Sequence, residues 1–428
     1  MGKGEAGASR PHHRIRPRFG NHPWLNKMSA YFLHPPFPNQ EGRPRTRFHL
    51  RLVVKAFTCY IPCISLILRQ FFTSFQNSCP DLVVPTSTIK PRSLNDHYGS
   101  ARRMSNEIDG YILCDDSSSL SHAIAAIQPA SVLVLDCEGK TLGVEGGTLS
   151  LIILRALEPE ISKAYLIDTI SLTKDQLNPI FDIIQSSSVT KIMYDGRKDF
   201  SELYHGCNVY LRGVLDLQLA DVNSRRQRGE NQWKQISRLL AFLPGREVYR
   251  KQYFYSAVHK LSGLEGSVGE HKIIKIQKND PSKDGFDSVM REVYPDILSV
   301  THSDWLIRPL SEQYLRYSSR DAYLISMLYA HFKERGYTNN HRLSTQSARY
   351  VSIFQGARPV VTDIFHRHCL LPLHILDYNG SAETRPCISC RRSLPQTAYP
   401  PQGWKTPSKR QCWVCRAVSV KSNMTTTR

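Results

Sequence analysis

Hydrophobic and polar residues follow clear periods along the middle of the chain, from about residue 104 onward. Short runs rich in Val, Ile and Leu predict buried strands, and apolar residues spaced three or four apart predict amphipathic helices. The predicted strands are residues 131–137, 149–154, 165–169, 191–194 and 209–215. The predicted helices are residues 119–127, 175–184, 198–204 and 233–243. Three neighbouring strands followed by alternating helices and strands indicate an α/β fold built on a mixed sheet.

The first 103 residues carry no such period. Stretches such as residues 10–19 mix Arg, Pro and His, so we predict a basic extension without a stable fold over residues 1–103. Residues 56–68 are the most apolar stretch, but Pro62 interrupts them and they are too few to span a bilayer. The sequence therefore predicts no membrane segment. The change of pattern at Met104 makes that residue a candidate start of the biological protein.

The net charge of +19 is concentrated at the two ends of the chain. Residues 1–103 carry 16 basic and four acidic side chains, a net charge of +12, and residues 341–428 carry 13 and three, a net charge of +10. The part between them has 27 basic and 30 acidic side chains, a net charge of −3. Two basic flanks on a near-neutral body fit a polyanionic partner such as nucleic acid, although solvated basic tails would give the same pattern.

Two carboxylates, Asp136 and Glu138, stand where an apolar strand should still be running. Because side chains alternate faces along a strand, both carboxylates point to the same side. Two acids this close repel each other unless a divalent cation lies between them. This stretch alone fits a metal site and also fits a strand that ends in water.

Asp195 and Asp199 follow the predicted strand 191–194 and lie near the end of the sheet where ligands of α/β proteins gather. We expect Asp195 to be the N-cap of the next helix. Asp199 is either part of a site or a first-turn acid that the helix dipole favours.

A third element, residues 305–329, predicts an amphipathic helix with Pro309 in its first turn. Tyr317 and Asp321 are four residues apart and therefore share one face of this helix. An acid in the middle of such a helix is costly unless it binds something, whereas Tyr317 alone would fit a core aromatic. Arg308 could reach a phosphate or cap the helix.

Three motifs in this order, L-D-C-E-G, D-G-R-K-D and Y-S-S-R-D after W-L-I-R-P-L, resemble those of the DEDDy family of 3′–5′ exonucleases. This family includes ribonuclease D and the Werner-type exonuclease domains. The resemblance covers about residues 108–338 and implies a ribonuclease H-like fold that hydrolyses nucleic acid from its 3′ end. The residues at the family's catalytic positions are Asp136, Glu138, Asp199, Tyr317 and Asp321.

The resemblance also implies a role for each of these residues. Four carboxylates would hold two Mg²⁺ or Mn²⁺ ions, which stabilise the attacking and leaving oxygens of the phosphodiester. Asp136 would bridge both ions, and Glu138 and Asp321 would complete one site, where the Tyr317 hydroxyl positions the attacking water. Asp199 would hold the second ion through its bound waters.

Compact members of this family are shorter between the second and third motifs. Here an insertion covers about residues 225–300 and contains basic stretches at residues 225–230 and 271–278. It could cover the active site, lengthen the path of the nucleic acid, or form a disordered loop.

The C-terminal region contains two Cys-x2-Cys pairs separated by 21 residues, which are Cys387, Cys390, Cys412 and Cys415. Four thiolates with this spacing predict a structural Zn²⁺ site, with two disulfides as the alternative. We therefore expect a zinc-ribbon-like module over residues 381–420, joined to the exonuclease domain by a linker over residues 341–380. Basic and aromatic residues between the pairs suit nucleic acid, and a zinc module that docks a protein would look the same.

The sequence thus predicts a metal-dependent 3′–5′ exonuclease acting on RNA or single-stranded DNA. The alternative is a non-catalytic adaptor that binds RNA or protein through the same fold and the zinc module. No signal peptide is evident, and prolines would break the amphipathic helix of a mitochondrial transit peptide. An intracellular protein of the nucleus or cytoplasm is therefore favoured over a mitochondrial one.

Overall fold

The computed structural model describes residues 110–160, 163–273, 304–377 and 380–426. The predicted extension over residues 1–103, the candidate start at Met104 and part of the insertion, residues 274–303, lie outside the described residues. Among the helices of the described segments, none is long and apolar enough to cross a membrane.

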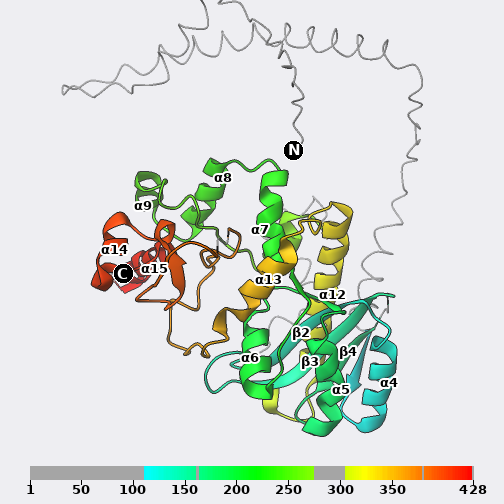
Figure 1. The fold of residues 1–428 in the computed structure, drawn as a ribbon. Helices are drawn as coiled ribbons and strands as arrows, with labels where there is room; N and C mark the ends of the chain where they lie inside the picture. The colour runs from blue at the N-terminus through cyan, green and yellow to red at the C-terminus, as the bar shows by residue number, and fades with distance from the viewer. Residues whose placement is uncertain (1–109, 161–162, 274–303, 378–379, 427–428) are drawn as a thin grey trace, which may run out of the picture. The chain divides into compact units, whose positions relative to one another are not determined.

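A six-stranded mixed sheet forms the centre of the fold, with strand order β1-β4-β3-β2-β5-β6 (Figure 1). The strands are β1 Tyr111–Cys114, β2 Val132–Lys140, β3 Thr148–Glu158, β4 Ala164–Asp168, β5 Thr190–Met193 and β6 Val214–Asp216. The pairs β2–β3 and β3–β4 are antiparallel, and β1–β4, β2–β5 and β5–β6 are parallel. The predicted α/β fold with a mixed sheet is confirmed.

Helices cover both faces of this sheet. The helices of the body are α4 Ser117–Ile127, α5 Lys174–Gln185, α6 Arg197–Cys207, α7 Leu217–Gln227, α12 Glu312–Glu334 and α13 Leu343–Val351. One core joins Leu133, Leu135 and Cys137 of β2 to apolar residues of α4, α5 and α6. The other joins Val132 and Val134 to residues of α7, α12 and α13. By alternation, Asp136 and Glu138 therefore project toward the face that α12 covers.

Strand β2 continues beyond the predicted end at Cys137. Asp136 pairs with Ile153 and Glu138 with Leu151 of β3, so both acids lie inside a paired strand. The interpretation of a strand that ends in water is therefore wrong. The ladder shifts register directly after Glu138, at Gly139. A Cβ at Gly139 would lie 2.2 Å from the carbonyl oxygen of Thr148, so this irregular close approach requires glycine.

Four elements differ from the prediction. Strand β1 was not predicted, and the strand expected over residues 209–215 begins only at Val214. The helix expected over residues 233–243 is two short elements, α8 Gln232–Ser237 and a 3-10 helix. Helix α12 begins at Glu312 with Ser311 as its N-cap, so placing Pro309 in its first turn was wrong.

Arg308 explains why the chain turns before α12. Its guanidinium forms an ion pair with the buried Asp168 of β4, with N–O distances of 2.5 and 2.7 Å. It also donates to the carbonyl oxygens of Trp305 and Ile307. Arg308 thus joins the sheet to this turn, and Ser311 is the N-cap of α12 in its place. The phosphate contact stays a prediction.

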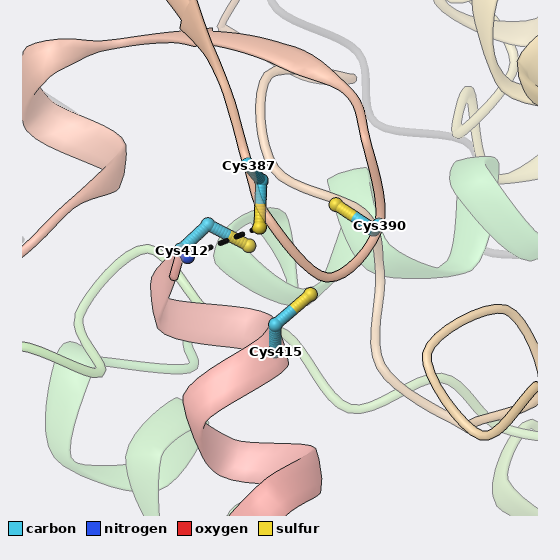
Figure 2. A group of neighbouring side chains, drawn as sticks. All are labelled: Cys387, Cys390, Cys412 and Cys415. Carbon is cyan, nitrogen blue, oxygen red and sulfur yellow. Dashed lines mark hydrogen bonds between the residues drawn. The ribbon is translucent and has the colours of Figure 1, made fainter. Parts of the chain in front are cut away.

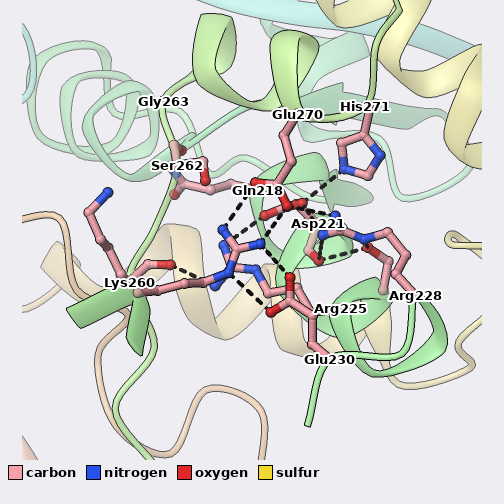
Figure 3. A network of polar contacts seen from close by, with 12 residues as sticks. Gln218, Asp221, Arg225, Arg228, Glu230, Lys260, Ser262, Gly263, Glu270 and His271 are labelled. Atoms are coloured by element: carbon pink, nitrogen blue, oxygen red, sulfur yellow. Dashed lines mark hydrogen bonds and ion pairs between the residues drawn. The ribbon is translucent and has the colours of Figure 1, made fainter. Parts of the chain in front are cut away.

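The described part of the insertion is ordered around a buried polar network (Figure 3). It contains α8, α9 Gly245–Arg250 and α10 Leu264–Glu270. Asp221 of α7 is completely buried and accepts from Arg225, Arg228 and His271, with distances of 2.8 to 2.9 Å. Glu270 pairs with Arg228 and Arg238. The disordered-loop interpretation is therefore wrong for this part. Two arginines of the basic stretch 225–230, Arg225 and Arg228, form ion pairs within the protein.

Residues 341–380, expected as a linker, begin with a packed helix. In α13, the Ser347 hydroxyl accepts from the N–H of Asp216 at 2.9 Å. The Tyr350 hydroxyl donates to Gln218 at 2.5 Å. The segment that follows pairs with the insertion through the backbone of Leu261 and Cys369 at 2.8 Å. This stretch therefore contributes to the body and is not a free connector.

The C-terminal module consists of a hairpin and two helices. These are β7 Thr384–Pro386, β8 Ser393–Pro395, α14 Pro401–Lys405 and α15 Trp413–Thr426. Its four predicted zinc ligands share a core with Ile236, Val248 and Tyr255 of the insertion. The rings of Phe254 and Trp413 stack at 4.4 Å between centroids, and Figure 1 shows α15 beside α9. The module is thus packed on the insertion.

We expect Asp221→Ala to destabilise the protein by about 3 kcal/mol, because it leaves buried cations without their shared partner. The arginines and His271 lower the pKa of Asp221 to about 2 despite its burial. A lowered folded pKa adds stability that is complete above the unfolded value of about 4 and is lost as the pH falls toward 2. Urea unfolding at neutral pH measures the loss. Asp182→Asn, on the exposed surface of α5, is the control, and equal stability of the two variants would contradict the prediction.

Candidate active site and metal centre

The structure brings the five predicted residues together from three elements. Asp136 and Glu138 lie on β2, Asp199 on the first turn of α6, and Tyr317 and Asp321 on α12. Asp199 is 6% exposed, and the other four are half-buried.

Asp199 is held against β2 at Cys137, the residue between Asp136 and Glu138 in the sequence. Its Oδ1 accepts a hydrogen bond from the backbone N–H of Cys137 at 2.9 Å. This N–H is available because the parallel pairing of β2 with β5 ends at Val134. The carboxylate of Asp199 replaces the missing strand partner, so it satisfies a buried donor and at the same time faces the site.

The start of α6 is fixed by the loop after β2. The N–H of Gly143 donates to Glu202 at 2.9 Å, and the Ser201 hydroxyl donates to the Gly143 carbonyl at 2.7 Å. Gly143 has φ +73°, and a Cβ there would lie 2.4 Å from the backbone oxygen of Lys198. Only glycine permits this approach. The close contact sets the distance between β2, which bears Asp136 and Glu138, and α6, which bears Asp199.

Tyr317 and Asp321 lie one turn apart on the same face of α12, and the charge of Asp321 is the main cause that raises the pKa of Tyr317. Trp305 packs on the tyrosine with ring centroids 6.2 Å apart. Arg320, which is almost completely buried, donates to Asp321 at 3.2 Å and forms a second ion pair with Glu265 of the insertion. The insertion therefore contacts the fourth acid through Arg320.

Burial raises the pKa of all four acids. Burial is the main cause for Asp136 and Glu138, whose pKa values lie well above the usual range, and the neighbouring carboxylates add to it. Burial also raises the pKa of Asp199 to about 7 and that of Asp321 to about 6. The negative charge of Asp321 raises the pKa of Tyr317, so its hydroxyl keeps its proton at neutral pH. Such a group of acids favours bound protons or bound cations.

The donor set fits divalent cations, because carboxylate oxygens are the ligands that hard Mg²⁺ and Mn²⁺ ions prefer. Within the described segments, the cysteines are the group of three or more potential ligands whose ligating atoms all lie within 4.8 Å of one another. The four acids are not part of this compact group.

Asp195, expected as the N-cap of α6, has a different place. Gly196 is the N-cap residue, and Asp195 has φ +60° and pairs with Arg197 through two contacts of 2.5 and 2.7 Å. Its carboxylate is paired with the guanidinium of Arg197, so it does not cap the helix. The N-cap prediction is corrected.

Two supporting contacts were not predicted from the sequence. Asp216, at the end of β6, caps α7 through the N–H of Gln218 and accepts from the N–H of Gly196 at 3.0 Å. An acid between a strand and a helix is a recognisable N-cap signal, but its second contact joins segments 20 residues apart. The Arg320–Glu265 pair joins residues 55 apart and leaves no local signal.

The four C-terminal cysteines form a compact cluster (Figure 2). All four are buried free thiols, so the structure does not contain the alternative disulfides. Their sulfur atoms lie within 4.8 Å of one another, and tetrahedral Zn–S bonds of about 2.3 Å place sulfurs about 3.8 Å apart. The N–H of Cys412 approaches the sulfur of Cys387 at 3.4 Å. Hydrogen bonds from the other three thiols lower the pKa of Cys387. A soft four-sulfur set of this kind fits Zn²⁺.

Residues 111–234 match the family model of the 3′–5′ exonucleases. The match includes Asp136, Glu138 and Asp199 and ends before Tyr317. It confirms the resemblance that the three motifs indicate, and the observed mixed α/β sheet agrees with a ribonuclease H-like exonuclease fold.

Several solved structures are similar to this chain at low identity. RNase D of Trypanosoma brucei in complex with RNA U12 is 20% identical, covering 61% of this chain and 77% of that one with a TM-score of 0.42. RNase D of Escherichia coli is 17% identical, covering 60% and 56%, with a TM-score of 0.34. The EXO domain of Aedes aegypti Nibbler is 17% identical, covering 57% and 96%, with a TM-score of 0.35. None of the curated proteins compared with this sequence matches it.

We expect Mg²⁺ or Mn²⁺ to stabilise the protein in a pH-dependent way. Raised folded pKa values mean that the contribution of these two acids to the stability of the metal-free protein is greatest at low pH. This contribution is lost as the pH rises through about 6 for Asp321 and about 7 for Asp199. A cation that replaces these protons should therefore increase Tm more at pH 8 than at about pH 5.5. Thermal melts with and without the ion measure this.

The matched controls are Asp136→Asn, which should lose the metal-dependent increase in Tm, and Asp182→Asn, which should keep it. An increase that is the same in both variants, or the same at both pH values, would place the ion elsewhere.

We expect one Zn²⁺ per chain that survives dialysis, and Cys412→Ser should lose it. Because the cysteines share a core with α8 and α9, hydrogen exchange should increase in the insertion as well as in the module. Cys369→Ser, at an exposed thiol outside the cluster, should retain the metal. Metal analysis that finds no zinc in the native protein would refute the assignment.

Proposed function

We propose that this protein is a metal-dependent 3′–5′ exonuclease that removes nucleotides from the 3′ end of RNA or single-stranded DNA. The observation that carries this proposal is the position of Asp199. Its hydrogen bond to the N–H of Cys137 holds this buried acid beside the half-buried Asp136 and Glu138, on the part of the β2 edge beyond Val134 that β5 does not cover. The match of residues 111–234 to the exonuclease family model supports the same function.

The four acids would hold two divalent cations, with Asp136 contributing to both, Glu138 and Asp321 to one and Asp199 to the other. When bound, such ions neutralise the phosphate and increase the acidity of the attacking water. The protein supplies fixed oxygen ligands whose mutual repulsion is relieved by positive charge. The hydrogen bond of Asp199 and the ion pair between Arg320 and Asp321 orient two of these ligands before any ion arrives.

Tyr317 would orient the water that attacks the phosphorus. Its hydroxyl remains protonated at neutral pH because Asp321 and burial raise its pKa, so it acts as a hydrogen-bond donor and acceptor and not as a base. Its ring is held by Trp305, which leaves the hydroxyl as the part available to a ligand. In this arrangement the nucleotide at the 3′ end leaves as a 5′-monophosphate.

Incubation of the full chain with 5′-labelled single-stranded RNA and DNA, in Mg²⁺, Mn²⁺ or EDTA, tests the proposal. We expect a ladder of shortened products that EDTA abolishes. Asp136→Asn should reduce kcat by at least about a hundredfold, and Tyr317→Phe should reduce kcat by about ten- to a hundredfold with little change in Tm. Asp182→Asn is the control for a removed surface charge.

Intact substrate under every condition, together with tight binding, would favour the alternative of a non-catalytic adaptor. Full activity of Tyr317→Phe would make that residue a packing aromatic. Immediate release of the labelled 5′ nucleotide would contradict the 3′–5′ direction. Discrete labelled fragments without a ladder would indicate endonucleolytic cleavage.

A further inference from the structure

A cavity of about 390 Å³ lies beside the N-terminal end of α6. Most of its lining comes from three segments: Asp195, Arg197 and Lys198 at the start of α6, residues 261–263 of the insertion, and residues 366–369 after α13. Gln218 and Phe354 complete the lining. Its volume is within the range of pockets that hold a ligand of nucleotide size. None of the five candidate catalytic residues lines it.

The walls of the cavity are fixed by hydrogen bonds. The Tyr194 hydroxyl donates to the carbonyl oxygens of Ser262 and Gly263 at 2.8 and 3.1 Å. The side-chain amide of Gln218 also donates to the Ser262 carbonyl, at 2.8 Å. The N–H of Leu261 donates to the carbonyl of Cys369 at 2.8 Å, which joins the second wall to the third. The cavity is therefore preformed and does not depend on a ligand to shape it.

Two of the walls lead directly to the candidate active site. Lys198 precedes Asp199 in the chain, and its positive charge lowers the pKa of Asp199 and of Glu138 against the larger effect of burial. On the other wall, the chain continues from Gly263 to Glu265, which pairs with Arg320 next to Asp321. A nucleic-acid strand whose 3′ end reaches the four acids would therefore run past this cavity.

The cations available to a ligand here are Lys198 and Arg367. Both are exposed, and Arg367 uses one guanidinium nitrogen on the carbonyl of Val361 at 2.6 Å. Arg197 is neutralised by Asp195. His368 contributes no charge at neutral pH, because burial and Arg197 lower its pKa to about 4. The two exposed cations come from different segments of one cavity, and this arrangement suits a chain of phosphates.

We propose that this cavity binds the sugar-phosphate backbone of the substrate strand on the 5′ side of the terminal nucleotide, through phosphate contacts of Lys198 and Arg367. This inference rests on the proposed function. The part of the chain that contains the acids, residues 104–340, has a net charge of −3, so it provides little attraction for a polyanion. Arg367 belongs to residues 341–428, with a net charge of +10, and brings a cation of this flank to the cavity.

Binding is measured on the full chain with Asp136→Asn in every protein, so that 5′-labelled single-stranded RNA remains intact. Adding Arg367→Ala should increase Kd about five- to tenfold and make the slope of log Kd against log salt shallower by about 0.7, as for one lost phosphate contact. Arg367→Lys keeps the charge and should restore most of the affinity. Arg226→Ala removes an exposed cation at the end of α7, away from the cavity lining, and should leave Kd unchanged.

Cys369 provides a second measurement that needs no substitution in the cavity. It is an exposed free thiol that lines this cavity. Saturating single-stranded RNA should slow its alkylation several-fold in the Asp136→Asn protein, as measured by peptide mass spectrometry. Cys207, which does not line the cavity, is the control and should react at the same rate with and without RNA.

Wild-type Kd and salt slope for Arg367→Ala, or unchanged alkylation of Cys369 at saturating RNA, would overturn the proposed strand path. Equal weakening by Arg226→Ala would also overturn it, because the effect would then be a general attraction of positive charge. If the native protein degrades RNA and these results are negative, only the strand path fails. If the native protein degrades nothing while Arg367 and Cys369 respond as expected, the exonuclease proposal fails and the binding site remains.

Discussion

The candidate active site depends on a single buried hydrogen bond between the sheet and a helix, from the N–H of Cys137 to the carboxylate of Asp199. The partner strand β5 ends early and leaves this N–H without a ladder contact, so the first turn of α6 takes its place. A buried donor without a partner costs about 1 to 3 kcal/mol, and this contact therefore favours one position of the helix. The same contact sets the third acid beside the two acids of β2.

Charge in this protein is used in two different ways. Asp221, Arg225 and Arg228 are paired in the interior and hold the insertion to the body. Lys198 and Arg367 are exposed and line a cavity beside the acids. Only the second kind can contribute to binding a polyanion, because breaking an internal pair would leave an uncompensated buried charge. The net charge of the chain therefore says less about binding than the position of each cation.

The insertion and the C-terminal module support each other. The cysteine cluster shares its core with α8 and α9, and residues 259–261 pair with residues 369–371. At the other end of the insertion, Glu265 reaches Arg320 beside Asp321. A continuous series of contacts thus runs from the cysteines to the fourth acid, although the residues involved are far apart in the sequence.

The sequence by itself determined the elements and the candidate ligands. Local periodicity predicts most strands and helices, alternation on β2 places Asp136 and Glu138 on one face, and helical spacing pairs Tyr317 with Asp321. It could not show that β2 continues past Cys137, because this depends on pairing with β3. It also could not show that Asp195 pairs with Arg197, because this depends on the positive φ of Asp195. It also could not distinguish buried from exposed arginines. Strand pairing and the burial of each arginine rest on contacts between distant segments, which only the tertiary structure decides.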